Sequence, residues 1–406
     1  MSTAESGVLG GAALALEQLD DLIVQSVAEV HTSVSGRIFG VSDRLTGHRT
    51  LPHRLHNGIS AAVYGGIGLG LRGASHALRA ADEAGWGPGL EDSARGRFVI
   101  SAVNGLIGDS LRESSPRLSF EMGVRHNGRH VPLEPAAMAS SYPDASNALV
   151  VFVHGLCETE DYWLRKRRPR RSDVPEPGSY GRRLEADEGW SPVFIRANTG
   201  TSIAESGVAL SALLGRLIEL WPTPVRRIAL VGHSMGGLII RSACAVETQS
   251  DWLDRVSDII TLGTPHLGSP VERGIARGIR VAEKVPELAP YRRIFAKRSA
   301  AVLELHDGLP DLAPVPHVNY RLVAASLTKS PRHPVSLAIG DLLVQPRSAL
   351  GLPRRGEPMF PDADTLLVPG ADHFDLLNHD DVYAALRGWL ANRAPQQPPV
   401  SQELTA

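Results

Sequence analysis

Cysteine is scarce in this sequence, which has only two among its 406 residues, Cys157 and Cys244. So few thiols exclude a disulfide framework and a cysteine-rich zinc site, although a single Cys157–Cys244 bridge stays open. An excess of charge of one sign is also missing, because 42 basic residues against 44 acidic ones leave a net charge of −2. Such a weak field does not recruit nucleic acid, so we expect no nucleic-acid partner.

Long apolar runs are absent as well. The sequence has no stretch of about 18 uninterrupted apolar residues, so no membrane-spanning helix is expected. Residues 1–11 contain neither Lys nor Arg, unlike the basic start of a secretory signal. We therefore expect a cytoplasmic protein. Peripheral membrane contact stays open. The glycine-rich stretch Ile59 to Leu71 carries no charge, so its surface is expected to be buried, either against the rest of the protein or against lipid.

Residues 1–114 differ in pattern from the rest of the chain. Val8 to Val34 is rich in Ala, Leu, Ile and Val at helical spacing, and similar stretches follow. No catalytic motif occurs in this segment. We interpret it as a helical module that either packs on the rest of the chain as a cap or faces a membrane. At the other end, residues 394–406 are rich in Pro and Gln and are expected to form a disordered tail.

From residue 115 to 393, apolar strands alternate with helical stretches. Two short strands, Leu118 to Val124 and His130 to Leu133, are expected on either side of Asn127-Gly128, a strong hairpin signal. Further strands are expected at 148–153, 193–197, 227–231, 258–262, 318–324 and 364–368, with helices at 203–220, 236–247 and 382–392. This alternation predicts an α/β fold: a mostly parallel sheet with a hairpin at one edge and helices on both faces. Residues 270–316, with several prolines and basic residues, are interpreted as an inserted cap segment.

One short motif points to chemistry, Gly232-His233-Ser234-Met235-Gly236, which fits G-x-S-x-G. A buried strand is expected just before it and a helix just after Ser234. The sharp turn between them requires neighbours without a side chain, because a Cβ would clash with the turn or the adjacent strand. The helix N-terminus then offers free N–H groups to a developing oxyanion. A chance match among 40 glycines is the alternative, and the strand–helix context argues against it.

This motif, read as Gly-His-Ser-Met-Gly-Gly, resembles the nucleophile turn of lipases and esterases in the α/β-hydrolase superfamily. The resemblance covers about residues 115–392 and extends loosely to lipase-like proteins related to the GPI-inositol deacylases. It implies the α/β-hydrolase fold, Ser234 as the nucleophile and no metal or other cofactor.

The same resemblance implies an oxyanion hole. His154-Gly155 ends an earlier expected strand, where the family's oxyanion loop begins. The backbone N–H groups of Leu156 and Met235 would then share the oxyanion, and losing one such donor costs about 3 kcal/mol. The alternative is an ordinary turn between a strand and a loop.

The base is expected near the end of the chain, because the triad of this fold runs in the order Ser, Asp or Glu, His. Six histidines follow Ser234, and only His373 lies just past the last expected strand and before the closing helix. Its context, with Leu376-Leu377 three and four residues later, resembles the family's histidine loop. His379 is the second candidate, and it also fits the turn before the last helix.

The acid is expected between the strand at 318–324 and His373. Gly340-Asp341-Leu342 resembles the family's Gly-Asp-Gly, although Leu342 replaces a glycine. Asp341 is therefore the first candidate, ahead of Asp362 and Asp364. Its role would be to hold His373 in one tautomer and to stabilise the imidazolium.

Three further features add predictions about the surroundings of the site. His266, in Gly-Thr-Pro-His, is either a pocket wall or part of a tight turn. Tyr162 and Trp163 follow the oxyanion loop and could line an acyl pocket. The basic run 165–171, six charges in seven residues, is a solvated loop or a contact for anionic lipid.

These residues together predict a serine hydrolase that cleaves carboxylic esters, lipid-like ones in particular, through an acyl-enzyme. The partner would be an ester or lipid substrate. An acyltransferase with the same triad is an alternative, and so is a catalytically silent binding protein. The oligomeric state does not follow from the sequence.

Overall fold

The computed structural model describes residues 120–164, 178–246, 251–268, 304–305, 307–329, 340–341 and 343–391, preceded by the short pieces 9–10, 13, 65–66, 69–82, 84, 96–98, 100–101 and 104–105. Most of the predicted N-terminal module lies outside these residues. So do the inserted segment up to residue 303, the basic run 165–171 and the tail 394–406.

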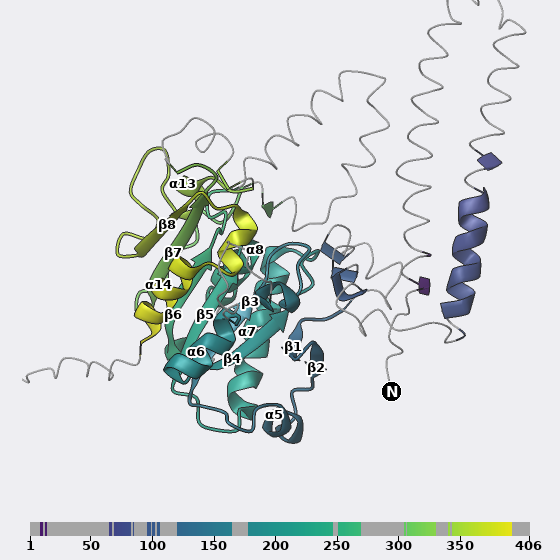
Figure 1. Cartoon of the computed structure of the whole chain (residues 1–406), viewed down its shortest axis with the longest axis horizontal. Helices are drawn as coiled ribbons and strands as arrows, with labels where there is room; N and C mark the ends of the chain where they lie inside the picture. Colours follow the sequence, from purple (N-terminus) through teal and green to yellow (C-terminus); the bar gives the residue numbers. More distant parts are fainter. Residues whose placement is uncertain are drawn as a thin grey trace, which may run out of the picture.

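Eight strands of the described chain form one sheet in the order β2-β1-β4-β3-β5-β6-β7-β8 (Figure 1). The strands are β1 (Gly123–His126), β2 (Arg129–Val131), β3 (Ala148–Val153), β4 (Ser191–Arg196), β5 (Arg227–His233), β6 (Val256–Leu262), β7 (Asn319–Ser326) and β8 (Asp364–Pro369). The six strands β3 to β8 are parallel to one another, whereas β1 is antiparallel to both of its neighbours, β2 and β4. The predicted parallel sheet with a hairpin edge is confirmed.

Helices connect the strands. They are α5 (Pro135–Ser141), α6 (Tyr180–Glu188), α7 (Ile203–Leu220), α8 (Met235–Cys244), α13 (Pro346–Ala349) and α14 (Asp380–Leu390), with 3-10 turns η4 (Glu160–Leu164), η5 (Leu253–Arg255) and η7 (His373–Leu377). The Ser202 side chain caps α7 by accepting the Glu205 N–H at 3.0 Å, which explains why this helix begins where the sequence predicts.

The core has two halves, one on each face of the sheet. Successive residues of a strand point to opposite faces. Leu149 and Val151 of β3 accordingly pack with α7 and α8, whereas Val150 and Phe152 pack with α6 and α14. A largely parallel sheet covered on both faces, with G-x-S-x-G at a strand-to-helix turn, is the predicted α/β-hydrolase fold.

The hairpin strand β1 is shorter than predicted. A strand was expected from Leu118 to Val124, but Phe120, Glu121 and Met122 are not in a strand. Pairing with β4 begins only at Gly123, which faces Arg196, the last residue of β4. Upstream residues therefore have no strand to pair with. The predicted turn is confirmed, since Asn127 and Gly128 have φ of 50° and 76°.

Among the described residues, no helix combines the length and the apolar character needed to cross a bilayer.

Candidate active site

Ser234 occupies the turn between β5 and α8. It has φ 51° and ψ −122°, and it is one of only three described residues other than glycine with a positive φ. Such a backbone costs on the order of 1–3 kcal/mol and persists where the surroundings hold it. Here the Ser234 N–H donates to the carbonyl of Leu262, at the end of β6, at 2.8 Å. The turn is thereby tied to the neighbouring strand.

The glycines around Ser234 are required by close backbone contacts. A Cβ on Gly236 would lie 2.3 Å from the carbonyl oxygen of Val153, at the end of β3. One on Gly232 would lie 2.5 Å from the backbone nitrogen of Gly237. Neither neighbour is a flexible side chain, so any larger residue would push the turn away from the adjacent strand.

Gly236→Ala is therefore expected to destabilise the protein by about 1–3 kcal/mol, the usual cost of overpacking a tight core site. The matched control is Gly215→Ala in α7, where a Cβ would meet nothing within 4 Å. Removing glycine from that helix is expected to stabilise by about 0.5–1 kcal/mol. Urea unfolding of both variants measures the difference, and equal midpoints would contradict the predicted close contact.

His373 and Asp341 form a buried pair, each with 1% of its side chain exposed. The Nδ1 atom of His373 lies 2.8 Å from Oδ2 of Asp341. The other carboxylate oxygen, Oδ1, accepts the N–H groups of Leu343 and Val344 at 3.0 and 2.8 Å, so the carboxylate cannot rotate freely. The Nε2 atom of His373 is buried and has no hydrogen-bond partner among the described residues.

The histidine loop lies next to the serine turn. Ser234 bonds to Leu262, and a Cβ on the following Gly263 would lie 3.0 Å from the ring of His373. The three residues proposed from the sequence as a triad thus come from three separate loops that meet at the same ends of parallel strands.

The competing candidates lie elsewhere. His379 is the N-cap of α14, where its side chain accepts the Asp381 N–H at 3.2 Å. Asp362 is exposed, and the exposed Asp364 forms an ion pair with Arg321. Of the acidic candidates, it is Asp341 that contacts His373.

The loop after β3 also faces Ser234. A Cβ on Gly155 would lie 2.9 Å from Cβ of Ser234, which places the next residue, Leu156, beside the serine turn. His154 holds this loop against β4. Its Nε2 atom accepts the Ala197 N–H at 3.0 Å, while Nδ1 lies 2.9 Å from the Gly155 carbonyl oxygen. Burial lowers the pKa of His154, in agreement with this neutral, accepting ring.

The sequence did not predict the buried contact between Glu158 and His233. Glu158 lies in the same loop, and its carboxylate lies 2.9 Å from Nδ1 of His233, the residue before Ser234. Nothing in the local pattern distinguishes this glutamate from the exposed acidic residues of other loops. The only available signal is that His233 belongs to the G-x-S-x-G motif.

The proposed pocket residues differ in burial. Tyr162 is half-buried between Phe98 and Phe374, with ring centroids 6.3 and 6.2 Å away. Trp163 is only 1% exposed and packs against Phe152 at 4.9 Å, which is the environment of a core side chain.

His266 is fully buried, and both of its ring nitrogens face protein groups. Nε2 lies 3.2 Å from the Thr261 hydroxyl, and Nδ1 lies 3.3 Å from the Arg241 guanidinium. Burial, followed by the Arg241 charge, lowers the pKa of His266 well below its ordinary value. Its contacts are those of a residue that holds the turn after β6. A role in the pocket wall stays a prediction.

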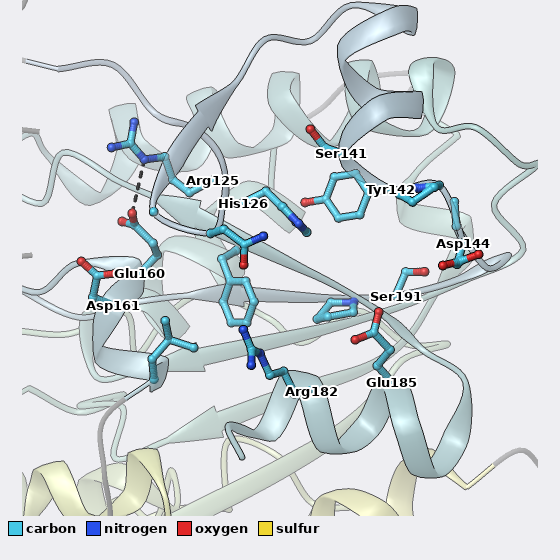
Figure 2. Close-up of a pocket in the computed structure, with 17 residues that line it drawn as sticks. Arg125, His126, Ser141, Tyr142, Asp144, Glu160, Asp161, Arg182, Glu185 and Ser191 are labelled. Carbon is cyan, nitrogen blue, oxygen red and sulfur yellow. Dashed lines mark hydrogen bonds and ion pairs between the residues drawn. The ribbon is translucent and has the colours of Figure 1, made fainter. Parts of the chain in front are cut away.

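A cavity of about 460 Å³ lies away from this group, at the hairpin edge of the sheet (Figure 2). Its lining includes His126, Tyr142, Arg182 and Glu185, and Figure 2 shows its Arg125 paired with Glu160. None of Ser234, His373 and Asp341 lines it. The candidate active site is therefore defined by side-chain geometry and not by this cavity.

Comparisons with known proteins agree with the fold and the motif. Residues 195–286, which include the serine turn, match a family model described as a PGAP1-like alpha/beta domain. A triacylglycerol lipase of Burkholderia plantarii is 28% identical over 152 residues, which cover 35% of this chain and 36% of the lipase. The matched part thus spans little more than a third of that relative.

Two solved structures are also similar. A mature Bacillus licheniformis lipase is 20% identical, with a TM-score of 0.40, and the match covers 66% of this chain and 97% of the lipase chain. A Pyrococcus furiosus esterase is 15% identical and covers 60% of this chain and 80% of its own, with a TM-score of 0.38. The detailed fold assignment rests on the strand order and the serine turn of this chain itself.

Proposed function

We propose that this α/β-hydrolase-fold chain, which resembles lipases and esterases, hydrolyses carboxylic esters with Ser234, His373 and Asp341 as a catalytic triad. The observation that carries the proposal is the combination of a strained serine turn with a neighbouring histidine. That histidine is hydrogen-bonded at Nδ1 to a buried carboxylate, 2.8 Å away, and Nε2 has no partner in the part of the chain that the structure describes.

In the first half of the reaction, Nε2 of His373 takes the Ser234 proton as the oxygen attacks the ester carbonyl. The tetrahedral intermediate collapses, the alcohol leaves with the proton from His373, and an acyl-enzyme remains. Asp341 stays ionised throughout. It holds the Nδ1–H tautomer and stabilises the imidazolium, and the two backbone N–H groups on its other oxygen keep it in place.

The oxyanion would be held by the N–H groups of Leu156 and Met235. Both residues adjoin Ser234: Met235 begins α8, and Leu156 follows Gly155, whose backbone approaches the serine. Two donors that are fixed before the reaction lower the barrier because they need no reorganisation when the charge develops. Water then attacks the acyl-enzyme, with His373 again as the base.

Lipid-like esters are the substrate class that we favour. One matched relative is a triacylglycerol lipase, and the residues next to the proposed oxyanion loop include the aromatic side chains Tyr162, Phe98 and Phe374. Aromatic walls suit an acyl chain better than a charged substrate.

The described residues 96–98, 100–101 and 104–105 would form part of a cap over this loop. Arg97 pairs with Asp161 at 2.8 Å, and the ring of Phe98 stacks on Tyr162. Further along, a Cβ on Gly105 would lie 2.6 Å from Sγ of Cys157 and 2.9 Å from its backbone nitrogen. These contacts favour the cap interpretation of the N-terminal segment over the membrane-facing one for this part of it.

A series of p-nitrophenyl esters of increasing acyl length tests the proposal. We expect turnover, with kcat/KM rising from acetyl to medium or long chains. Product analysis in the presence of an alcohol separates hydrolysis from acyl transfer.

Gly105→Val should lower kcat/KM because it displaces Cys157 beside Leu156. Gly73→Val should not, because a Cβ at Gly73 would meet no atom within 4 Å. No turnover of any ester by the folded protein would refute the proposed activity.

A further inference from the structure

The imidazole of His233 lies between two hydrogen-bond acceptors. Nδ1 is 2.9 Å from the Glu158 carboxylate, and Nε2 is 3.1 Å from the backbone carbonyl oxygen of His373. A neutral imidazole has one N–H and could donate to only one of them. With an ionised Glu158, both contacts are satisfied only when the ring is an imidazolium with two donors.

Glu158 extends this connection to the oxyanion loop. Its Oε2 atom accepts the N–H of Gly155 at 2.7 Å, one residue before Leu156. A continuous chain of hydrogen bonds therefore runs from Gly155 through Glu158 and His233 to His373. Ser234 follows His233 directly, so one side-chain pair joins the oxyanion loop, the serine turn and the histidine loop.

The pair lies in the protein interior. His233 is fully buried and Glu158 is 2% exposed. The other groups around His233 are Asp341, which adds negative charge, and the rings of His373, Phe374 and Trp163, with centroids 4.7, 6.2 and 6.4 Å away. A charged pair in such surroundings is tolerated when its hydrogen bonds are complete, and breaking one partner is costly.

We propose that Glu158 and His233 are positioning residues, which as a buried ion pair hold the oxyanion loop and the histidine loop in register around Ser234. The proposal rests on the proposed ester hydrolysis for its catalytic consequence, but the ion pair itself is a structural claim. Neither residue contacts substrate in this mechanism.

The pair has a defined pH range. Burial alone would lower the pKa of His233, but Glu158 and the hydrogen bonds raise it above its ordinary value. Burial alone would raise the pKa of Glu158, but His233 and the Gly155 N–H hold it below its ordinary value. The stabilisation from His233 is therefore complete below the ordinary pKa of histidine and lost as pH rises through its folded-state pKa. The stabilisation from Glu158 is complete above the ordinary pKa of glutamate and lost as pH falls through the folded-state pKa of Glu158.

Two substitutions at Glu158 test the positioning role. Glu158→Gln keeps every hydrogen bond, because its amide oxygen accepts from Gly155, its NH₂ donates to Nδ1 and a neutral His233 still donates from Nε2. Glu158→Ala loses the hydrogen bonds of the side chain to the Gly155 N–H and to His233.

We expect Glu158→Ala to lower kcat by about 10–100-fold, because small misplacements of reacting groups cost that much. KM should stay within about twofold of the wild-type value. Glu158→Gln should restore kcat to within about threefold of wild type and move the alkaline limb of the pH profile upward.

An NMR measurement tests the ion pair without relying on activity. Long-range ¹H–¹⁵N spectra of the histidine rings should show His233 as an imidazolium at pH 7.5 in the wild-type protein and in Ser234→Ala. In Glu158→Gln it should be a neutral tautomer. His154, which accepts a hydrogen bond at Nε2, is the neutral internal reference in every spectrum.

The control variant is Glu134→Gln, an exposed glutamate without a side-chain cap bond, which should change neither readout. A neutral His233 in the wild-type protein would overturn the ion pair, even if Glu158→Ala failed to fold. Wild-type kcat and pH profile in Glu158→Ala, or a folded Glu158→Gln as impaired as Glu158→Ala, would overturn the positioning role. Undiminished hydrolysis by Ser234→Ala with an imidazolium at His233 would refute the proposed function alone.

Discussion

Ser234→Ala is expected to lower kcat for ester hydrolysis by about 10⁶-fold, the loss seen when a triad nucleophile is removed. The reason is that the acyl-enzyme can no longer form, and only transition-state binding by the backbone N–H groups remains. Labelling by a fluorophosphonate probe should disappear as well. The fold should survive, because alanine and serine meet the same strain at a φ of 51° and the anchoring bond to Leu262 uses the backbone N–H.

Steady-state kinetics on a p-nitrophenyl ester, probe labelling and near-ultraviolet circular dichroism measure these effects. Ser140→Ala is the matched control, since Ser140 is exposed on α5, and it should behave as the wild type does. A folded Ser234→Ala protein that hydrolysed esters at nearly the original rate would show that the nucleophile lies elsewhere.

His373→Ala should be about as damaging as the loss of the serine, near 10⁶-fold in kcat, because triad members act as a unit. Asp341→Asn should cost less, about 10⁴-fold, since it removes the acceptor that selects the productive histidine tautomer. The hydrogen bond of 2.8 Å between His373 Nδ1 and Asp341 is the structural basis for both expectations. The same kinetic assay measures both variants.

His379→Ala provides the comparison. Its ring caps α14, so we expect about 1 kcal/mol less stability and nearly unchanged kcat. The double variant His373→Ala with Asp341→Asn should be no worse than His373→Ala alone. A severe loss at position 379 with none at 373 would reverse the assignment of the base.

Much of the fold follows from local pattern. The helix at Ile203–Leu220 and the strand at Ala148–Val153 have the predicted bounds, because each combines a clear apolar pattern with an evident end. The turn at Asn127-Gly128 follows from the backbone preference of those two residues. The start of β1 could not be predicted, since it depends on where β4 ends in the folded sheet.

The sequence by itself determined the parallel sheet and the serine turn, because glycine spacing and the alternation of strands and helices are local or near-local features. Tertiary structure alone decided that Asp341 and not Asp364 faces His373, and that Trp163 is a core residue. It also decided that Glu158 meets His233 across a gap of 75 residues. The charge state of a buried side chain depends on which acceptors surround it, and those come from loops that only folding brings together.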